Sequence, residues 1–114
     1  MEKSGYSLLL PTGMLDYFEI TDLHEDDTSI DIYLREFNII PQEYKDDKLQ
    51  SKGFYDEVTI NDFPIRGRRL LLHLKRRKWL NESTGDIVSR DWGLVAKGTR
   101  MTQEFASFLK GYLR

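Results

Sequence analysis

Between Arg68 and Leu80 the sequence alternates with a period of two residues, and this pattern restricts the fold more than any other feature of the chain. Leucines occupy positions 70, 72 and 74, whereas Arg69, His73, Lys75 and Arg77 occupy odd positions. Successive side chains of a β-strand point to opposite faces, so the leucines would face a core and the cationic side chains would face outward. The pattern therefore predicts a long, half-buried strand.

Period-two runs also flank an acidic turn at residues 24–27, which predicts an antiparallel hairpin. A second turn at residues 62–67 contains Pro64 and Gly67, and would connect a strand at residues 54–61 to the strand that begins at Arg68. A polar turn at residues 81–85 would lead into a further strand at residues 86–92. Pro41 and the charged residues around it predict an extended surface connection over residues 38–50, and Pro11 suits a single helical turn before Tyr17.

The period changes near the end of the chain. Apolar residues there follow the i, i+4, i+7, i+8 and i+11 spacing of an amphipathic helix: Met101, Phe105, Phe108, Leu109 and Tyr112. We therefore predict an α+β fold, in which antiparallel hairpins or a small sheet are closed by one C-terminal amphipathic helix. A chain of 114 residues fits a single domain, residues 1–114.

Charge is distributed unevenly along this domain. Residues 1–47 carry twelve acidic and three basic side chains, a net charge of -9, whereas residues 48–114 carry a net charge of +7. Within the basic part, seven of the thirteen residues from Arg66 to Lys78 are Arg or Lys. Such a run is typical of a surface that binds a polyanion, and nucleic acid is the first partner to consider.

The predicted DNA-binding residues are Arg66, Arg68, Arg69, Lys75, Arg76, Arg77, Lys78 and Trp79. On a strand, alternate cations would form a row spaced by about 6.7 Å, comparable with the phosphate spacing of nucleic acid. Two alternatives remain open: the cations pair with the acidic part of the chain, or they keep a sheet edge soluble. Trp79 could stack on a base or lie buried.

Other functional classes find little support in the sequence. The chain has no cysteine and two histidines, so a zinc site is not expected and no cofactor is predicted. Isolated glycines form no phosphate-binding loop, and no Ser, His and Asp follow a recognisable catalytic order, so we predict no enzymatic activity. Apolar runs are too short to span a membrane, and we expect a cytoplasmic protein.

Several motifs of the chain together form a family pattern. They are Lys52-Gly53-Phe54-Tyr55, the run Ile60-Asn61-Asp62-Phe63-Pro64-Ile65-Arg66-Gly67, Leu72, the pair Arg76-Arg77, and Lys97-Gly98-Thr99-Arg100-Met101-Thr102. This pattern resembles the N-terminal module of bacterial insertion-sequence transposases of the DDE class. With Leu8-Leu9-Leu10-Pro11 and Ser89-Arg90-Asp91-Trp92, nearly the whole chain is similar to small stand-alone N-terminal-region proteins encoded beside a transposase.

The resemblance implies a zinc-finger-like part at residues 48–114, but the chain departs from the family at the metal site. The cysteines of the family are replaced by the segment from Lys78 to Gly85, so a polar turn must hold this hairpin without zinc. The DDE catalytic domain is also missing from the sequence. The resemblance thus implies a non-catalytic accessory domain that binds transposon-end DNA during transposition. The alternatives are a module that docks on a separately encoded transposase subunit or on a second copy, and an enzyme acting on a small anionic ligand.

Overall fold

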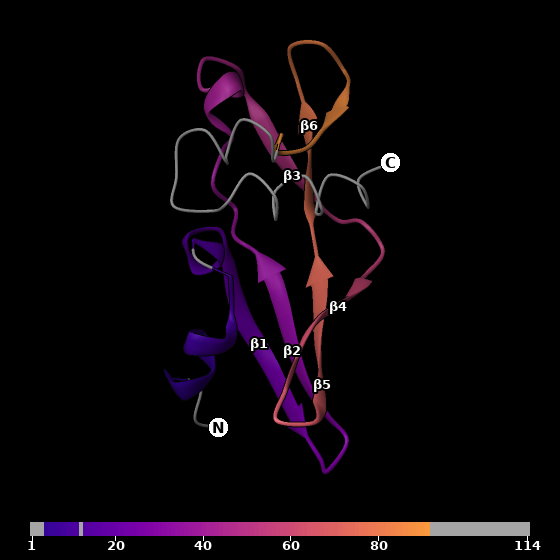
Figure 1. Ribbon diagram of the computed structural model, residues 1–114. Coiled ribbons are helices and arrows are strands. Elements are labelled where there is room, and N and C mark those ends of the chain that lie inside the picture. The colour runs from indigo at the N-terminus through magenta and orange to yellow at the C-terminus, as the bar shows by residue number, and fades with distance from the viewer. Residues whose placement is uncertain (1–3, 12, 92–114) are drawn as a thin grey trace.

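The computed structural model describes residues 4–11 and 13–91, which form two β-sheets and three short 3-10 turns (Figure 1). The elements are η1 (Ser4–Leu9), η2 (Met14–Asp16), β1 (Phe18–Glu25), β2 (Ser29–Glu36), η3 (Gln42–Tyr44), β3 (Leu49–Phe54), β4 (Val58–Ile65), β5 (Arg68–Lys75), β6 (Arg77–Asn81) and β7 (Ile87–Val88). The four-stranded sheet has the order β1-β2-β5-β4, and the three-stranded sheet has the order β3-β6-β7.

The predicted hairpin around the acidic turn is present as β1 and β2, which pair in antiparallel fashion. The Asp26 carboxylate closes its turn by accepting hydrogen bonds from the backbone N–H groups of Thr28 and Ser29, each at 2.8 Å. These two bonds and one from the Thr28 hydroxyl lower the pKa of Asp26 to about 2. An acidic residue in this turn therefore has a folding role.

A second hairpin runs through both sheets. β4 and β5 pair in the four-stranded sheet, and β3 and β6 continue the same two chain directions into the three-stranded sheet. The Tyr55 N–H donates to the Arg76 carbonyl at 2.9 Å, so the two halves remain connected between the sheets. Figure 1 shows β6 following β5 almost in line along the length of the molecule. The single strand predicted from Arg68 to Leu80 is thus divided at Arg76 between two sheets.

The core lies on one face of the four-stranded sheet. Leu70, Leu72 and Leu74 are at most 1 % exposed, as their alternation predicts. They pack with Ile60 of β4, with apolar residues at alternate positions of β2, and with Met14 and Phe18 from the N-terminal segment. Each buried leucine contributes about 1.5–3 kcal/mol relative to an exposed one, so this alternation is the main determinant of the sheet.

β2 and β5 pair in parallel, which the sequence analysis did not predict. The pairing places Asp31 beside Leu71 and brings the two cations Arg35 and Lys75 side by side, so a strand from the acidic part of the chain lies along the basic run. One alternative is therefore present in the structure: part of the acidic segment packs directly against the basic run. A parallel pair requires a long connection, and here residues 37–67 supply it.

The predicted α+β class is wrong. The described residues form a predominantly β structure in two sheets, and their only helical elements are the 3-10 turns. The predicted C-terminal helix and the motif at residues 97–102 lie outside the described residues, as does Trp92. Residues 38–50, predicted as a plain connection, contain η3 and the start of β3, while the last predicted strand is limited to Ile87–Val88.

Asn81 holds the hairpin between β6 and β7 through hydrogen bonds of its backbone and its side chain. Asn81 is 2 % exposed, and its carbonyl accepts the Gly85 N–H at 2.7 Å while its side-chain oxygen accepts the Ser83 N–H at 2.9 Å. Its amide nitrogen donates to Asp47 at 3.0 Å. One buried side chain thus organises the turn and ties it to the preceding connection.

Candidate nucleic-acid interface

The pleat of β5 separates the basic run into two faces. Arg69 and Lys75 extend from the face opposite the core and are exposed, whereas the leucines between them are buried. Neither cation forms an ion pair within 4.0 Å in the part of the chain that the structure describes. We call this face of the four-stranded sheet the outer face.

Arg66 is the exposed tip of the hairpin between β4 and β5. It has φ 50° and Gly67 has φ 82°, so both central residues of the turn adopt the left-handed conformation typical of a type I′ hairpin. Gly, Asn and Asp are preferred at such positions, because a longer L side chain is strained there by about 1–2 kcal/mol. The chain therefore keeps an arginine where the backbone disfavours one.

Arg68 is turned toward the β1–β2 hairpin instead of the outer face. Its guanidinium lies 3.4 Å from the Glu25 carboxylate and donates to the Asp26 carbonyl at 3.3 Å. The Arg68 side chain is 30 % exposed. Its charge is partly neutralised, so it contributes less to an attraction for phosphate than Arg66 or Arg69.

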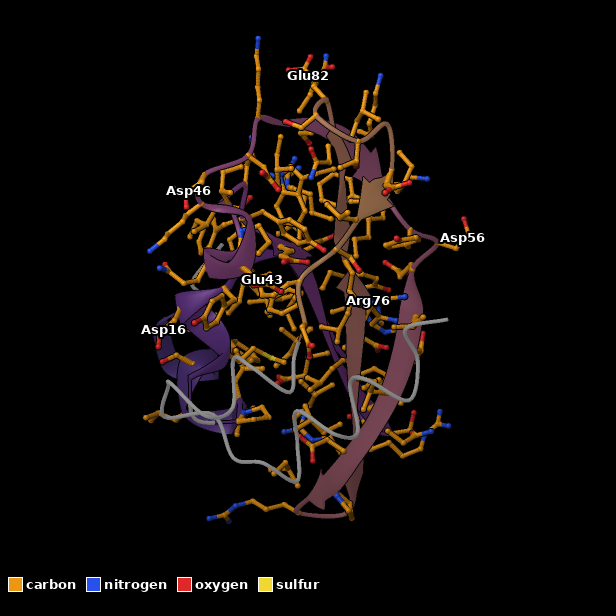
Figure 2. The ribbon with its side chains drawn as sticks, turned by 90° about the horizontal axis from the view of Figure 1, so that it is seen from above. Asp16, Glu43, Asp46, Asp56, Arg76 and Glu82 are labelled. Carbon is orange, nitrogen blue, oxygen red and sulfur yellow. The ribbon has the colours of Figure 1, made fainter. Side chains whose placement is uncertain are left out.

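The bases at the junction of the two sheets are parts of the folded interior. Arg76 is 4 % exposed and lies among other side chains, whereas Asp46, Asp56 and Glu82 project at the margin of the molecule (Figure 2). Burial lowers the pKa of Arg76, while Tyr55 and Glu36 act in the opposite sense. Its guanidinium carbon lies 5.0 Å from the centre of the Tyr55 ring, a cation–π distance.

Arg77 is likewise committed to the junction, although its odd position predicted an outward direction. It donates to the Ser51 hydroxyl at 2.6 Å and to the Glu36 carbonyl at 3.3 Å, and its guanidinium lies over the Phe54 ring. The predicted row of Arg69, Lys75 and Arg77 is therefore reduced to its first two members. The reason is the break at Arg76, after which β6 joins a different sheet.

Trp79 is fully buried, and its indole N–H donates to the Asn38 side chain at 2.9 Å. Trp79 was expected either to stack on a base or to lie buried, and the structure shows that it is buried. Its ring therefore offers no open face to a base. Lys78 is half-buried and lies 5.4 Å from the centre of the Tyr55 ring. Lys78 forms no ion pair with a described residue, but it belongs to β6 of the three-stranded sheet and is therefore not part of the outer face.

Glu36 is the centre of the junction and was missed by the sequence analysis, as was its partner Arg90. The two side chains are 1 % and 5 % exposed, and Arg90 Nε donates to Glu36 Oε2 at 2.9 Å. Burial raises the pKa of Glu36, and the Arg77 N–H and the charges of Arg90 and Arg76 reduce this rise. Arg90 also lies over the Tyr17 ring at 4.8 Å. The pair links the end of β2 to the chain beyond β7.

The middle of the outer face carries a hydrogen-bonded line across three strands. His73 Nε2 lies 2.7 Å from Asp31 Oδ1, and His73 Nδ1 lies 3.0 Å from the Thr59 hydroxyl. The Tyr33 and His73 rings are stacked at 4.3 Å with an angle of 12° between their planes. The sequence did not indicate this line, because its members are 14 and 42 residues apart.

Asp31 is also approached by the other histidine of the chain, with His24 Nδ1 at 3.7 Å. Burial alone would raise the pKa of Asp31, but hydrogen bonds from His73, Ser29 and His24, together with the charge of His73, leave it lowered. A hydroxyl, an imidazole and a carboxylate lie in a row, but the ring nitrogens are reversed relative to a hydrolase triad, because the hydroxyl lies at Nδ1 and the carboxylate at Nε2. Thr59 and His73 are also direct cross-strand partners, a pairing that stabilises sheets. Among the described residues no group of His, Asp and Glu is arranged to hold a metal ion.

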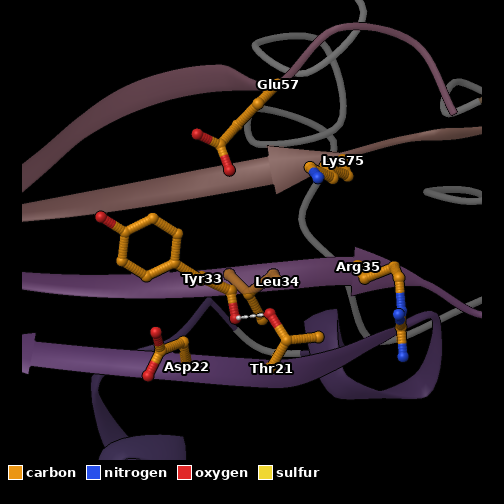
Figure 3. A pocket seen from close by; sticks show the side chains of 7 residues that line it. All are labelled: Thr21, Asp22, Tyr33, Leu34, Arg35, Glu57 and Lys75. Carbon is orange, nitrogen blue, oxygen red and sulfur yellow. Dashed lines mark hydrogen bonds between the residues drawn. The ribbon is translucent and has the colours of Figure 1, made fainter.

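Beside this line the outer face contains a shallow hollow (Figure 3). Its lining consists of Thr21, Asp22, Tyr33, Leu34, Arg35, Glu57 and Lys75. Its volume is about 250 Å³. Lys75 is the only lining residue that the sequence analysis selected.

Comparisons with protein-family models, with curated proteins and with solved structures found no match for this chain. The resemblance to transposase N-terminal modules therefore stays a prediction. Within the described residues, no helix is long and apolar enough to cross a membrane.

Proposed function

We propose that this chain is a non-catalytic DNA-binding module of an insertion-sequence transposase and acts in the cytoplasm during DNA transposition. DNA would be contacted through three cations, Arg66, Arg69 and Lys75. The observation that carries the proposal is that these side chains are exposed, lie on one turn and one strand, and form no ion pair with any described residue. Arg76, Arg77 and Trp79, which the sequence also selected, would act by building the fold.

The spacing of the cations sets the strength of this contact. Arg69 and Lys75 are separated by six residues of one strand, or about 20 Å, which spans several phosphates of a DNA strand. Three phosphate contacts are fewer than strong sequence-specific proteins make, so we expect weak binding that is sensitive to salt. The contact would fix the module on the backbone of the DNA without selecting a base sequence.

Arg66 supplies independent support. A left-handed residue that is neither Gly, Asn nor Asp costs folding free energy, and such outliers occur preferentially at functional sites. Folding does not favour an arginine at the tip of this hairpin, and a role in binding would explain why one is found there.

The test is the affinity for a labelled 20-base-pair duplex, measured by fluorescence anisotropy at low salt. The variant Arg66→Asn/Arg69→Gln/Lys75→Gln should lose most of the binding. The matched control Lys45→Gln/Lys48→Gln/Lys52→Gln removes the same charge from exposed positions elsewhere and should bind almost as well as the parent. Equal losses of affinity in both variants would show that binding depends on net charge alone and not on these three positions. Absence of binding by the parent chain would overturn the proposal.

Docking on a separately encoded transposase subunit, or on a second copy, is a second candidate. Leu80 and Ile87 are paired in register on one side of the three-stranded sheet, and Ile87 is 52 % exposed. An exposed apolar residue beside a half-buried one is a common element of a protein interface. Co-purification with the subunit after nuclease treatment, lost in Ile87→Glu and retained in the triple variant above, would favour this candidate.

A further inference from the structure

Apart from Lys75, the hollow on the outer face consists of groups that the proposed backbone contacts do not use. Thr21 and Asp22 of β1 lie on one side of it, Lys75 of β5 lies on the other, and Tyr33 and Arg35 of β2 lie between them (Figure 3). It therefore combines one aromatic ring, two cations and two carboxylates. A ligand that fits must offer a flat apolar surface, hydrogen-bond donors and a negative charge at separate points.

One face of the Tyr33 ring is available to such a ligand. His73, on β5, stacks against the ring at 4.3 Å. β1 and β5 lie on opposite sides of β2 in the sheet, so the other ring face is directed toward β1. Asp22 is the register partner of Tyr33 on that side, and it lines the same hollow. The Tyr33 ring thus stacks on His73 with one face, and its other face is free to stack on a flat ligand.

The two cations lie one strand repeat beyond the rings. Arg35 and Lys75 are register partners, each two residues after Tyr33 and His73, respectively. Two residues of a strand cover about 6.7 Å, which is about the distance between a base and its own phosphate. Arg35 is held in place by Glu19, to which its Nε donates at 3.1 Å, and this pair partly neutralises its charge. Lys75 has no ion pair to a described residue and is therefore the stronger anion-binding group of the two.

We infer that the hollow binds one unpaired nucleotide of a single strand. The base stacks on the open face of Tyr33, the phosphate lies between Lys75 and Arg35, and Asp22 accepts a hydrogen bond from an amino group of the base. The carboxylates keep the phosphate at the cationic rim, because they repel a negative charge placed deeper in the hollow. The inference rests on the proposed function and narrows its substrate to DNA with unpaired bases.

Duplex DNA cannot use this site, since its bases are stacked on one another inside the helix. Stacking on an aromatic side chain contributes about 1–3 kcal/mol per base, equivalent to roughly 5- to 150-fold in affinity. Arg66 and Arg69 lie outside the hollow and act equally on both forms of DNA, so stacking in the hollow would be the source of a preference for the single strand.

The experiment compares a 12-nucleotide single strand with the duplex of the same sequence, by fluorescence anisotropy at one fixed salt concentration. The parent chain should favour the single strand. Tyr33→Leu should weaken single-strand binding about tenfold and change duplex binding less than twofold. Tyr33→Phe keeps the ring and should behave as the parent, whereas Arg69→Gln should weaken both forms to a similar extent.

A second variant covers the case in which Tyr33→Leu fails to fold. Thr21 is exposed on the edge strand β1, so Thr21→Met fills the hollow without entering the core, and it should also remove the preference for the single strand. If the parent binds both forms equally and neither variant alters the ratio, the nucleotide site is wrong while the proposed function stands. If no DNA binds at any salt concentration, both are wrong.

Discussion

The basic residues of β5 and those at the sheet junction come from one uninterrupted run, yet their environments are opposite. Arg69 and Lys75 extend into solvent, whereas Arg76 is 4 % exposed and Arg77 donates to Ser51 and Glu36. The difference arises because the strand changes sheets at Arg76. A run of charges is thus not one surface, and the pleat and the sheet boundary decide which members can meet a ligand.

The junction should be the more sensitive of the two regions to the loss of one charge. Glu36→Gln leaves the Arg90 guanidinium buried without its counter-charge, and breaking a buried pair in this way costs about 3–5 kcal/mol. Urea unfolding monitored by tryptophan fluorescence measures the change. The control Glu19→Gln breaks the exposed pair with Arg35 and should cost less than about 1 kcal/mol. Similar losses in the free energy of unfolding for the two variants would contradict the difference between the buried junction and the exposed face.

A smaller effect is expected at Trp79, a candidate for base stacking that is buried in the folded chain. Trp79→Phe keeps an aromatic ring but removes the N–H that donates to Asn38, and it leaves a small cavity. We expect a loss of about 1–2 kcal/mol in the free energy of unfolding. DNA affinity measured on the folded variant should be unchanged, and a selective loss of affinity would place Trp79 in the interface after all.

These contrasts also show how far the sequence alone could lead. The alternation of Leu70, Leu72 and Leu74 was sufficient to predict their strand and its buried face, because sheet periodicity is a local property. The parallel pairing of β2 with β5 was not predictable, since nothing in either strand specifies a partner 40 residues away. The predicted α+β class was wrong because the described residues form two β-sheets with 3-10 turns alone, whereas the helical pattern near the end of the chain lies outside them.

The candidate site was predicted in the same partial way. Arg69 and Lys75 followed from the alternation, and the burial of Arg76 continues the even positions of Leu70, Leu72 and Leu74. Its even number was therefore the available signal that it does not face outward. Buried positions become odd only at Trp79 and Asn81, after the strand has passed into the second sheet. Glu36 and Arg90 are 54 residues apart and gave no signal, and neither did the contact between Asp31 and His73.

At the hairpin tip, stability and binding should change in opposite directions. Arg66→Asn places a residue that tolerates the left-handed conformation at φ 50°, and should raise the free energy of unfolding by about 0.5–1 kcal/mol. The same variant removes one exposed charge and should weaken DNA binding. Thermal unfolding and anisotropy on one preparation would test both effects, and a variant that is stabilised and binds equally well would exclude Arg66 from the interface.

The smallest effect concerns pH. The pKa of Asp26 is lowered to about 2 and that of Asp31 is also lowered, so their contributions to stability are complete above about pH 5 and are lost as the pH falls toward 2. The urea midpoint should decrease over this range, and less steeply in Asp26→Asn, which cannot titrate. Asp27→Asn is the matched control. If the urea midpoint of the Asp26 variant decreased with pH as steeply as that of the parent, the Asp26 turn would not be the source of the pH dependence.

The most direct test of the division of the basic run is the salt dependence of duplex binding. Each phosphate neutralised contributes about 0.9 to the slope of log affinity against log salt, so three exposed cations predict a slope of about 3 in magnitude. The variant Arg66→Asn/Arg69→Gln/Lys75→Gln should bring the slope close to zero. A slope of about 6 in the parent, as seven contacting bases would give, or a slope that persists in the triple variant, would contradict the account.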